Sequence, residues 1–326
     1  MDVVIKFNNA QKRFGRKVIF TDVNLEINKG EIYGIIGMSG SGKTTLLNTI
    51  IGFYTPDYGD ILFYSFEDNI YKSVFKNLTE VKKTFGFATQ VPSFYPKLTL
   101  KENLHYFGRL YHLSTSTIEA NAEKLLELTN LHDHKNALAG DLSEGMKKRL
   151  DLACSLMHNP HVLLMDEPTA DLDPVLRRET WKLINGIHKM GTTVIVASHI
   201  LSELEASCDR LCMLHDSRIV AVGTPDQLKK SYSHKKEEIH LESIPGNYDK
   251  IAAKLSAYKS IGIDKMTVKD GKLVISATDA ESALHTLLHI IENSGEKLVS
   301  ADIKKPSLVE VFEALYEKGE ENAKHH

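Results

Sequence analysis

The sequence contains little cysteine, which limits the classes of protein to which it can belong. Among its 326 residues are three cysteines, together with one tryptophan and nine prolines. Cys208 and Cys212 stand at positions i and i+4 in an apolar setting, which predicts packing residues in a reducing compartment. A disulfide framework or a cysteine metal site is therefore not expected.

The sequence also lacks long apolar runs. Runs such as residues 162–165 and 194–197 are far shorter than the roughly 20 apolar residues that cross a bilayer. The opening Met1-Asp2-Val3 predicts the start of a strand rather than a signal peptide. We therefore expect a cytoplasmic protein that meets a membrane only through a partner.

Neither sign of charge dominates the sequence. Lys and Arg together number 40, Asp and Glu number 43, and the net charge of −3 is spread along the chain. No overall basic field favours binding to nucleic acid or to an anionic membrane surface, so no nucleic-acid partner is expected. The apolar and charged fractions, 42% and 25%, are typical of a soluble globular protein.

Length and pattern along the chain predict two domains. The first covers residues 1–230 and contains a helical subdomain at about 91–160. Residues 231–237 are polar and without periodicity, which predicts a linker. An α+β accessory domain is expected at residues 238–318, followed by a frayed tail at 319–326.

Alternating strands and helices predict the architecture of the first domain. A buried strand at residues 32–36 is followed by a glycine-rich loop and then by a helix that begins at Lys43. Two further apolar strands, at residues 162–165 and 193–197, stand on either side of a helix at about 174–190. This order is typical of a doubly wound α/β fold with a parallel sheet.

Capping signals predict a group of helices inserted into this fold. Thr99 and Glu102 form one capping box, Ser116 and Glu119 form a second, and a third helix is expected to start near Ser143. These helices make up the predicted helical subdomain.

The order of elements in residues 238–303 predicts the fold of the accessory domain. Strand, helix, strand, strand, helix and strand follow one another, with a hairpin turn at Asp270-Gly271. This βαββαβ order is that of a ferredoxin-like unit. Ser307 and Glu310 then form a capping box for a last helix.

Residues 37–44 carry the strongest functional signal. Their sequence, Gly-Met-Ser-Gly-Ser-Gly-Lys-Thr, fits G-x-x-x-x-G-K-[ST], a loop whose backbone N–H groups wrap the phosphates of a nucleotide. Lys43 is expected to neutralise the β- and γ-phosphates, Thr44 to bind Mg²⁺ and Thr45 to donate to the α-phosphate. An ordinary glycine turn is the alternative, which the flanking strand and helix disfavour.

Asp166 and Glu167 follow directly after the strand at residues 162–165. Ligands of open α/β sheets bind at the carboxyl ends of such strands. We expect Asp166 to hold the metal and Glu167 to orient or deprotonate the attacking water, which favours ATP hydrolysis. The alternative is a solvated strand end, which the nearby phosphate loop disfavours.

A third motif lies about twenty residues before this acid pair. The sequence Leu142-Ser143-Glu144-Gly145-Met146, taken with the two motifs above, resembles the signature of ABC transporter ATPases, and the resemblance covers about residues 3–230. It implies a P-loop NTPase core of the ABC type with an inserted helical subdomain and an N-terminal antiparallel β subdomain.

The same resemblance implies a head-to-tail dimer that holds two ATP molecules at its interface. In that family Ser143, Glu144 and Gly145 of one subunit would cap the γ-phosphate held by the other. This sequence has Glu144 where the family usually has glycine, and Met146 where glutamine is common. A carboxylate at this position is expected to weaken the capping of the γ-phosphate. Taken alone, Ser143 would be a plain helix cap.

The family pattern also implies roles for residues outside these motifs. Gln90 would touch Mg²⁺ and report the nucleotide state to the helical subdomain, and His199 would contact the γ-phosphate. Asp171 and Asp173 would couple the two composite sites, and Phe14 would stack on adenine. The alternatives are a polar surface residue for Gln90, a strand-end histidine for His199, a helix cap for Asp171 and core filling for Phe14.

The expected site is therefore a composite one that uses ATP and Mg²⁺ and no other metal. Its catalytic residues are Glu167 and His199, and its Mg²⁺ ligands are Thr44, Gln90 and Asp166. The residues expected to bind ATP are Phe14, Ser39, Gly40, Ser41, Gly42, Lys43, Thr44, Thr45 and Gln90.

The end of the chain favours export. Residues 305–312 are similar to the end of ATPase subunits from exporters of drugs, ions, antibiotics and polysaccharides, and the same residues are also expected to form an amphipathic helix that packs the accessory domain. We predict an ATPase subunit that works as a homodimer or heterodimer on a separate integral membrane permease, at the inner face of the cell membrane. The predicted apolar sockets for the permease are Val91, Phe94, Tyr95 and Leu98, although internal packing is at least as good an interpretation for any one of them.

Two other functions are alternatives to this prediction. A soluble ABC ATPase that acts on nucleic acid or the ribosome would carry two ATPase domains, long coiled coils or basic arms, and the sequence shows none of these. A regulatory ATP-binding module that scarcely turns over would have Glu167 or His199 missing or displaced by neighbouring residues, and both are present.

Overall fold

The computed structural model describes residues 2–233, 237–256, 262–269, 271–304 and 307–312. The chain divides into two compact units, Met1–Thr224 and Pro225–His326. The predicted tail at 319–326, part of the predicted linker and Asp270 of the predicted hairpin turn lie outside the described residues. Each unit is described by itself below.

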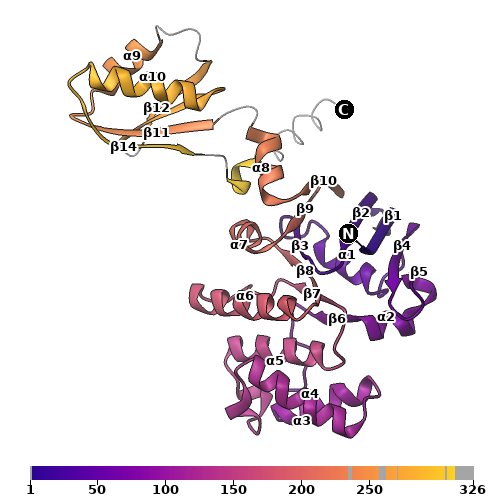
Figure 1. The fold of residues 1–326 in the computed structure, drawn as a ribbon. Helices are drawn as coiled ribbons and strands as arrows, with labels where there is room; N and C mark the ends of the chain where they lie inside the picture. Colours follow the sequence, from indigo (N-terminus) through magenta and orange to yellow (C-terminus); the bar gives the residue numbers. More distant parts are fainter. Residues whose placement is uncertain (1, 234–236, 257–261, 270, 305–306, 313–326) are drawn as a thin grey trace. The chain divides into compact units, whose positions relative to one another are not determined.

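A six-stranded sheet forms the centre of the first unit (Figure 1), with the order β10-β9-β3-β8-β7-β6. Five strands run parallel, and β10 is antiparallel to β9. The inner strands β3, β7 and β8 are buried along their whole length, which suits apolar runs without polar alternation. The bounds are β3 Ile32–Ile36, β6 Phe85–Ala88, β7 Val162–Asp166, β8 Thr193–Ser198, β9 Arg210–His215 and β10 Arg218–Gly223. The predicted parallel α/β core is confirmed.

An antiparallel sheet lies beside this core, with the order β2-β1-β4-β5. Its strands are β1 Val3–Phe14, β2 Lys17–Asn28, β4 Tyr58–Ser65 and β5 Ile70–Ser73. Helix α1 (Lys43–Ile50) shares one buried apolar cluster with both sheets, because Leu46, Leu47 and Ile50 pack there with Phe63 and Ile195. The helix that follows the phosphate loop is therefore held from both sides.

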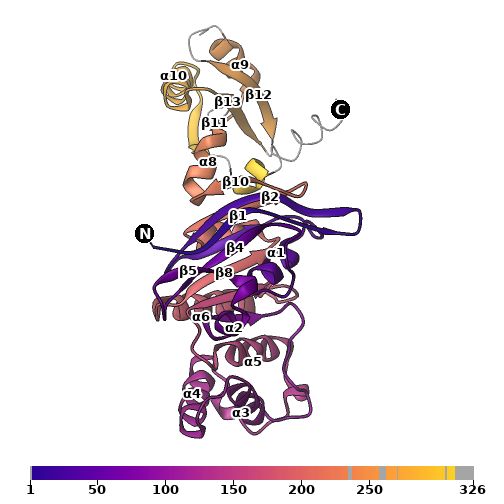
Figure 2. The ribbon, with the colours of Figure 1, turned by 90° about the vertical axis from the view of Figure 1, so that its right-hand side faces the viewer.

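Helices α3, α4 and α5 form a separate group at one end of the first unit (Figure 2). The helices of this unit are α1, α2 Leu78–Thr84, α3 Leu100–Leu110, α4 Thr115–Leu128, α5 Glu144–Leu156, α6 Pro174–Lys189 and α7 Leu201–Ser207, with 3₁₀ turns at Val74–Lys76, His132–His134 and Ala139–Asp141. The capping box of Thr99 and Glu102 is confirmed.

The capping box predicted at Ser116 and Glu119 is wrong. Helix α4 begins at Thr115, and Ser114 caps it by accepting a hydrogen bond from the backbone of Thr117. The carbonyl of Ser114 also accepts the backbone N–H of Ile118 at 2.9 Å, so the first intrahelical bond forms two residues earlier than predicted. This segment offers several hydroxyls in succession, and the earliest of them caps the helix.

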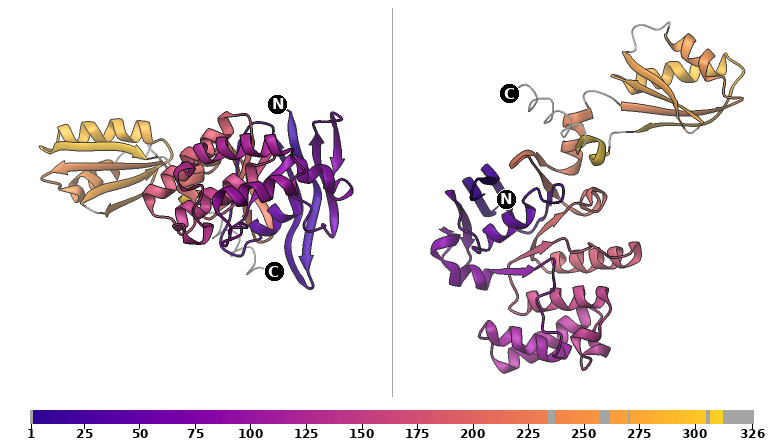
Figure 3. Two further views of the ribbon diagram at one scale, coloured as in Figure 1. Left: turned by 90° about the horizontal axis from the view of Figure 1, so that it is seen from below. Right: turned by 180° about the vertical axis from the view of Figure 1, so that it is seen from behind.

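The second unit contains a four-stranded antiparallel sheet in the order β12-β13-β11-β14 (Figure 3). Its elements are α8 Pro225–Ser233, β11 Glu237–Ile244, α9 Tyr248–Ser256, β12 Ile263–Lys269, β13 Lys272–Ala277, α10 Ala280–Glu292 and β14 Lys297–Lys304. With two βαβ halves and this strand order, the fold is ferredoxin-like, as the sequence predicted. Residues 231–233, expected in a linker, belong instead to helix α8. Ser307 and Glu310 form the predicted capping box.

Two glycines of the first unit offer a matched test of its packing. A Cβ on Gly86 of β6 would lie 2.5 Å from the carbonyl oxygen of Ser155 and 2.9 Å from Cγ of Pro160, whereas a Cβ on Gly186 of α6 would meet nothing within 4 Å. We expect Gly86→Ala to lower the free energy of unfolding by about 1–3 kcal/mol, because the backbone of β6 or α5 must move to relieve the contact with Ser155. Gly186→Ala should raise it by up to about 1 kcal/mol.

Urea unfolding followed by the fluorescence of Trp181, the one tryptophan of the chain, measures both changes in the first unit. Equal stabilities of Gly86→Ala and the parent would contradict the close packing of β6 on α5.

The buried His158 predicts a loss of stability in acid. Its ring stacks on Tyr111 with centroids 3.7 Å apart, and its Nε2–H donates to the carbonyl of Phe85 at 3.1 Å. Burial lowers the pKa of His158 from 6.5 to about 4. The unfolded chain therefore takes up this proton first, so the folded state loses about 2–3 kcal/mol as the pH falls from about 6.5 to 4.

The variant His158→Gln separates this effect from the general acid sensitivity of the chain. Its stability relative to the parent should be constant above about pH 7 and should rise as the pH falls toward 4, measured by urea unfolding at each pH. A difference that does not change with pH would rule out the histidine as the cause.

Candidate functional site

The glycine-rich loop joins β3 to α1 in a shape that only glycine allows at two positions. Gly42, the N-cap of α1, has φ +107°, and a Cβ there would lie 2.7 Å from Cγ2 of Ile19. A Cβ on Gly37 would lie 2.7 Å from the carbonyl oxygen of Leu214. Among the described residues, none caps the first turn of α1 with its side chain. The backbone N–H groups at this helix start are therefore available to an anion.

Lys43 lies across this loop with its ammonium nearly shielded from solvent. Its Nζ donates to the carbonyl oxygens of Gly37 at 2.8 Å and Met38 at 3.1 Å, and it lies 3.3 Å from Oε1 of Glu167. Only 6% of the Lys43 side chain is exposed. The carboxylate of Glu167 therefore compensates a buried charge that a phosphate group can also neutralise.

Glu167 stands directly after β7 and links Lys43 to His199. The ring N–H at Nδ1 of His199 donates to Oε2 of Glu167 at 2.8 Å. Glu167 has φ +51°, a left-handed conformation that is strained for a residue with a side chain, and its backbone N–H donates to Ala197 at 2.8 Å. The structure thus brings together three predicted site residues. They are Lys43 at the start of α1, Glu167 after β7 and His199 after β8.

Asp166 ends β7 with one carboxylate oxygen left without a partner. The residue is 2% exposed, and its Oδ1 has no hydrogen bond within the described part of the chain. Burial raises the pKa of Asp166, while a hydrogen bond from the side chain of Thr44 opposes the rise. A buried oxygen without a partner beside a threonine hydroxyl suits a hard cation such as Mg²⁺.

The other expected Mg²⁺ ligand, Gln90, follows β6, the strand next to β7 in the sheet. Gln90 is exposed, and its backbone carbonyl accepts a hydrogen bond from Nζ of Lys148 at 2.6 Å. Ser39, Gly40, Ser41 and Thr45 lie in the loop and first turn as expected, and Oγ of Ser41 is buried without a partner among the described residues.

The signature segment lies at the start of α5. Ser143 is the N-cap and accepts the backbone N–H of Met146 at 3.4 Å. The carboxylate of Glu144 is 70% exposed and pairs with Lys147 at 2.8 Å. A Cβ on Gly145 would lie 3.1 Å from Cδ1 of Leu176. Figures 1 and 2 both show α5 with α3 and α4 and away from α1, and the described contacts of Ser143 and Glu144 lie within α5 itself.

The loop between β7 and α6 contains Asp171 and Asp173. Asp173 caps α6 by accepting two backbone N–H groups at 2.8 and 3.0 Å, so the alternative that Asp171 is the cap is wrong. Asp171 has φ +63°. The carboxylate of Glu203 on α7 accepts hydrogen bonds from Thr169 Oγ1 at 2.5 Å and Trp181 Nε1 at 2.9 Å. This loop is therefore fixed to the helix that follows His199.

Phe14 lies at the end of β1 with 45% of its surface exposed. Its ring meets Tyr54 edge-on with centroids 5.1 Å apart, and Nζ of Lys12 lies 5.3 Å from its centroid. Core filling, the alternative for this residue, is wrong. The exposed ring face is free to receive a planar ligand.

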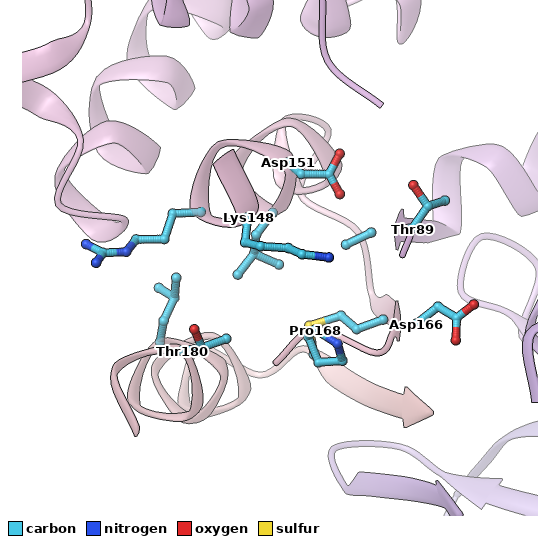
Figure 4. Close-up of a pocket in the computed structure, with 11 residues that line it drawn as sticks. Thr89, Lys148, Asp151, Asp166, Pro168 and Thr180 are labelled. Atoms are coloured by element: carbon cyan, nitrogen blue, oxygen red, sulfur yellow. The ribbon is translucent and has the colours of Figure 1, made fainter. Parts of the chain in front are cut away.

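Two polar residues that the motifs did not indicate line a small cavity together with Thr89 and Asp166. They are Lys148 and Asp151, both on α5, and Figure 4 shows Lys148 extended between Asp151 and Asp166. The signal that could have found Asp151 is a single acid between Leu150 and Leu152 in an otherwise apolar stretch of helix. Its partner lies in a distant loop, so the pattern alone did not suggest a role.

Two negative findings apply to the described residues. In that part of the chain no helix is both long and apolar enough to cross a membrane. Nor do three or more His, Cys, Asp or Glu side chains gather there in a group that can hold a metal ion.

The ABC transporter family model matches residues 20–170. The Nod factor export ATP-binding protein I of Burkholderia lata is 36% identical over 227 residues, which are 70% of this chain and 73% of that protein. The daunorubicin resistance ATP-binding protein DrrA3 of Streptomyces coeruleorubidus is 31% identical over 313 residues, 95% of each chain.

Solved structures are similar to about 70% of this chain. The protein cbiO1 of Clostridium perfringens, part of the ABC transporter complex cbiONQ, matches with a TM-score of 0.64 and 27% identity over 70% of this chain and 91% of its own. The ADP conformation of MJ1267, an ATP-binding cassette of an ABC transporter, matches with a TM-score of 0.62 and 27% identity over 70% of this chain and 93% of its own.

Proposed function

The chain belongs to the ABC transporter family and is a transport-coupled ATPase of that family, and from this premise we propose that it drives an exporter whose membrane permease is a separate chain. The observation that carries export is the match with the daunorubicin resistance protein, which extends over 95% of both chains and so includes the second unit. The Nod factor export protein supports the same direction. The comparisons favour neither of the two alternative functions.

The arrangement of the site suggests how hydrolysis begins. In the structure, Glu167 is engaged by Lys43 on one oxygen and by His199 on the other. Binding of phosphate groups by Lys43 and the amides of α1 would release Oε1 of Glu167, which can then accept a proton from the attacking water. His199 would hold the carboxylate through the other oxygen.

We assign Mg²⁺ to Asp166 and Thr44, because they combine an unpartnered buried carboxylate oxygen with a hydroxyl. The ion would neutralise charge on the phosphates when bound. Gln90 would approach the same place from the loop after β6. Phe14 would hold the adenine on its exposed ring.

A second subunit is needed to complete the site. Ser143, Glu144 and Gly145 start α5, in the helical group that stands away from the phosphate loop of the same chain. The start of a helix attracts anions, so this segment would meet the γ-phosphate held by another copy or by a related subunit. Two such contacts form together in a head-to-tail dimer, with the loop of Asp171 and Asp173 between the sites.

A groove in the first unit suits a permease segment. A cavity of about 390 Å³ is lined by apolar side chains from the end of α1, α2, β6 and the end of α3, including Phe53, Leu78, Phe87 and Tyr111. Phe53 is 70% exposed, and its ring meets Tyr54 edge-on with centroids 4.9 Å apart. A large apolar side chain this exposed beside a groove favours a contact with another protein. We place the permease contact here, at the inner face of the membrane.

The apolar sockets expected from the sequence lie in a different loop. Val91 and Tyr95 are exposed and remain candidates for the permease contact. Phe94 is only 8% exposed and therefore belongs to the core.

Glu167→Gln tests the assignment of the catalytic base. The amide keeps the shape but cannot take a proton, so ATP turnover should fall by about 10²-fold or more. Loss of the Glu167 charge also frees Lys43 for phosphate, so an ATP-bound dimer should accumulate in the variant. Turnover is measured by phosphate release, and the dimer by light scattering with and without ATP.

Glu127→Gln, an exposed change on α4, is the control for this experiment. Turnover of Glu167→Gln at the parental rate would reject Glu167 as the base. Loss of turnover without an ATP-dependent dimer would indicate that the active pair is a heterodimer.

The carboxylate of Glu144 predicts a weakened dimer. Glu144→Gln removes a negative charge beside the expected γ-phosphate. The free energy of dimerisation should become more favourable by about 0.3–1 kcal/mol, which lowers the dissociation constant of the dimer about two- to fivefold. In the Glu167→Gln background, ATP should then assemble half of the dimer at a correspondingly lower protein concentration. The gain should shrink at high salt, because exposed charges are screened. An unchanged midpoint would show that Lys147 already cancels the charge.

A further inference from the structure

The loop that follows β6 is fastened to α5 at two points. Asp151 Oδ1 accepts the backbone N–H of Ser93 at 2.7 Å and the hydroxyl of Ser93 at 2.9 Å. One turn earlier on α5, Nζ of Lys148 donates to the backbone carbonyl of Gln90 at 2.6 Å. Both ends of the segment from Gln90 to Ser93 are therefore held by the same helix.

Asp151 is an unusual residue for a plain packing contact. It is 2% exposed, and burial raises its pKa, while the hydrogen bonds from Ser93 and the charge of Lys148 lower it. A buried carboxylate costs free energy unless its oxygens are bonded, and an apolar residue would fill the same space without that cost. The feature that an apolar residue could not supply is the double hydrogen bond to the loop.

The same helix begins with the signature segment. Asp151 lies eight residues after Ser143, which is about two turns of α5. In the proposed site, Gln90 would contact the Mg²⁺ ion held by the same subunit. A change in the position of Gln90 would then be transmitted to α5, whose first turn would meet the ATP held by the other subunit. Because a helix moves as a rigid body, the bonds from Lys148 and Asp151 make the loop of Gln90 and the first turn of α5 move together.

We propose that Asp151 and Lys148 are positioning residues that couple the Gln90 loop to the signature helix, so that nucleotide at one site controls the cap offered to the other site. The coupling rests on the proposed function of the chain, since it requires a dimer with two composite sites. Neither residue touches nucleotide in this scheme. Each acts through the segment that it holds.

A purely structural role is the competing explanation, and the chain offers a matched control for it. Asn103 on α3 is also fully buried. Its side chain accepts the backbone N–H of Tyr95 at 2.8 Å and donates to the carbonyls of Tyr95 and Thr99 at 3.0 Å. It fastens the next part of the same loop, but to α3 rather than to α5.

The test compares four variants of the full chain by steady-state ATP hydrolysis and thermal unfolding. Asp151→Ala and Lys148→Met should lower kcat about tenfold or more, while KM for ATP changes less than about threefold, because the phosphate loop is untouched. Asp151→Asn should keep kcat within about threefold, because its amide oxygen can still accept both bonds from Ser93. Asn103→Ala should lose thermal stability with kcat unchanged below its unfolding temperature.

Dimer assembly gives a second readout. In the Glu167→Gln background, Asp151→Ala should need about tenfold more protein to form the ATP-bound dimer, while binding of a fluorescent ATP analogue to the monomer stays the same. Lys182→Met, an exposed change on α6, controls for loss of one lysine and should match the parent.

Three results would overturn the coupling. They are a kcat within twofold of the parent for both Asp151→Ala and Lys148→Met, an equal loss of kcat in Asn103→Ala, or a failure of Asp151→Asn to restore kcat. Lys148 is only partly buried, so Lys148→Met keeps the test valid if Asp151→Ala does not fold. Parental turnover and the Glu167→Gln dimer are measured first in the same assays. An inactive parent would remove the proposed function and the coupling together, whereas an active parent with equally active variants would remove the coupling alone.

Discussion

The buried ion pair between Lys43 and Glu167 is the interaction on which the site depends. An ammonium that is 6% exposed cannot remain in the phosphate loop without a compensating charge, and Glu167 supplies that charge from 3.3 Å away. The strained backbone of Glu167 and its bond to His199 follow from this requirement, because the carboxylate must leave the end of β7 and turn toward α1. In the proposed mechanism, the same contact occupies Glu167 until a phosphate group takes its place beside Lys43.

Much of this arrangement could be predicted from local sequence. A phosphate loop, a strand that ends in two acids and a histidine after the next strand all lie at the carboxyl edge of one parallel sheet, so their meeting follows from topology. The ferredoxin-like order of the second unit was predicted for a similar reason, since period-2 strands and capped helices are signals within short windows. That unit has a separate apolar core, built around Ile239, Ile275 and Leu287, which is consistent with its own pattern being sufficient.

The predictions that were wrong concern choices that local pattern leaves open. Ser114 and Ser116 are both good helix caps, and only the packing of the helix selects the first. Asp171 and Asp173 can likewise both cap the helix that follows them, and in the structure Asp173 is the cap. Phe94 packs inside the protein rather than offering a socket at the surface, and a single aromatic residue in a loop carries no periodicity to decide between these two interpretations. Asp151 was missed because its partner, Ser93, is 58 residues away in the sequence.

Two buried carboxylates near the site differ in the hydrogen bonds that they accept, and this difference distinguishes a candidate ligand of a cation from a residue that joins two parts of the protein. Asp151 and Asp166 are both 2% exposed, and burial raises the pKa of each. Oδ1 of Asp151 accepts two hydrogen bonds from one distant loop, so its capacity is used inside the protein. Oδ1 of Asp166 accepts none within the described residues. A buried charge left in this state is costly unless a ligand completes its bonding, so the unsatisfied oxygen supports the proposed cation site, and the satisfied one supports the proposed coupling of the loop to α5.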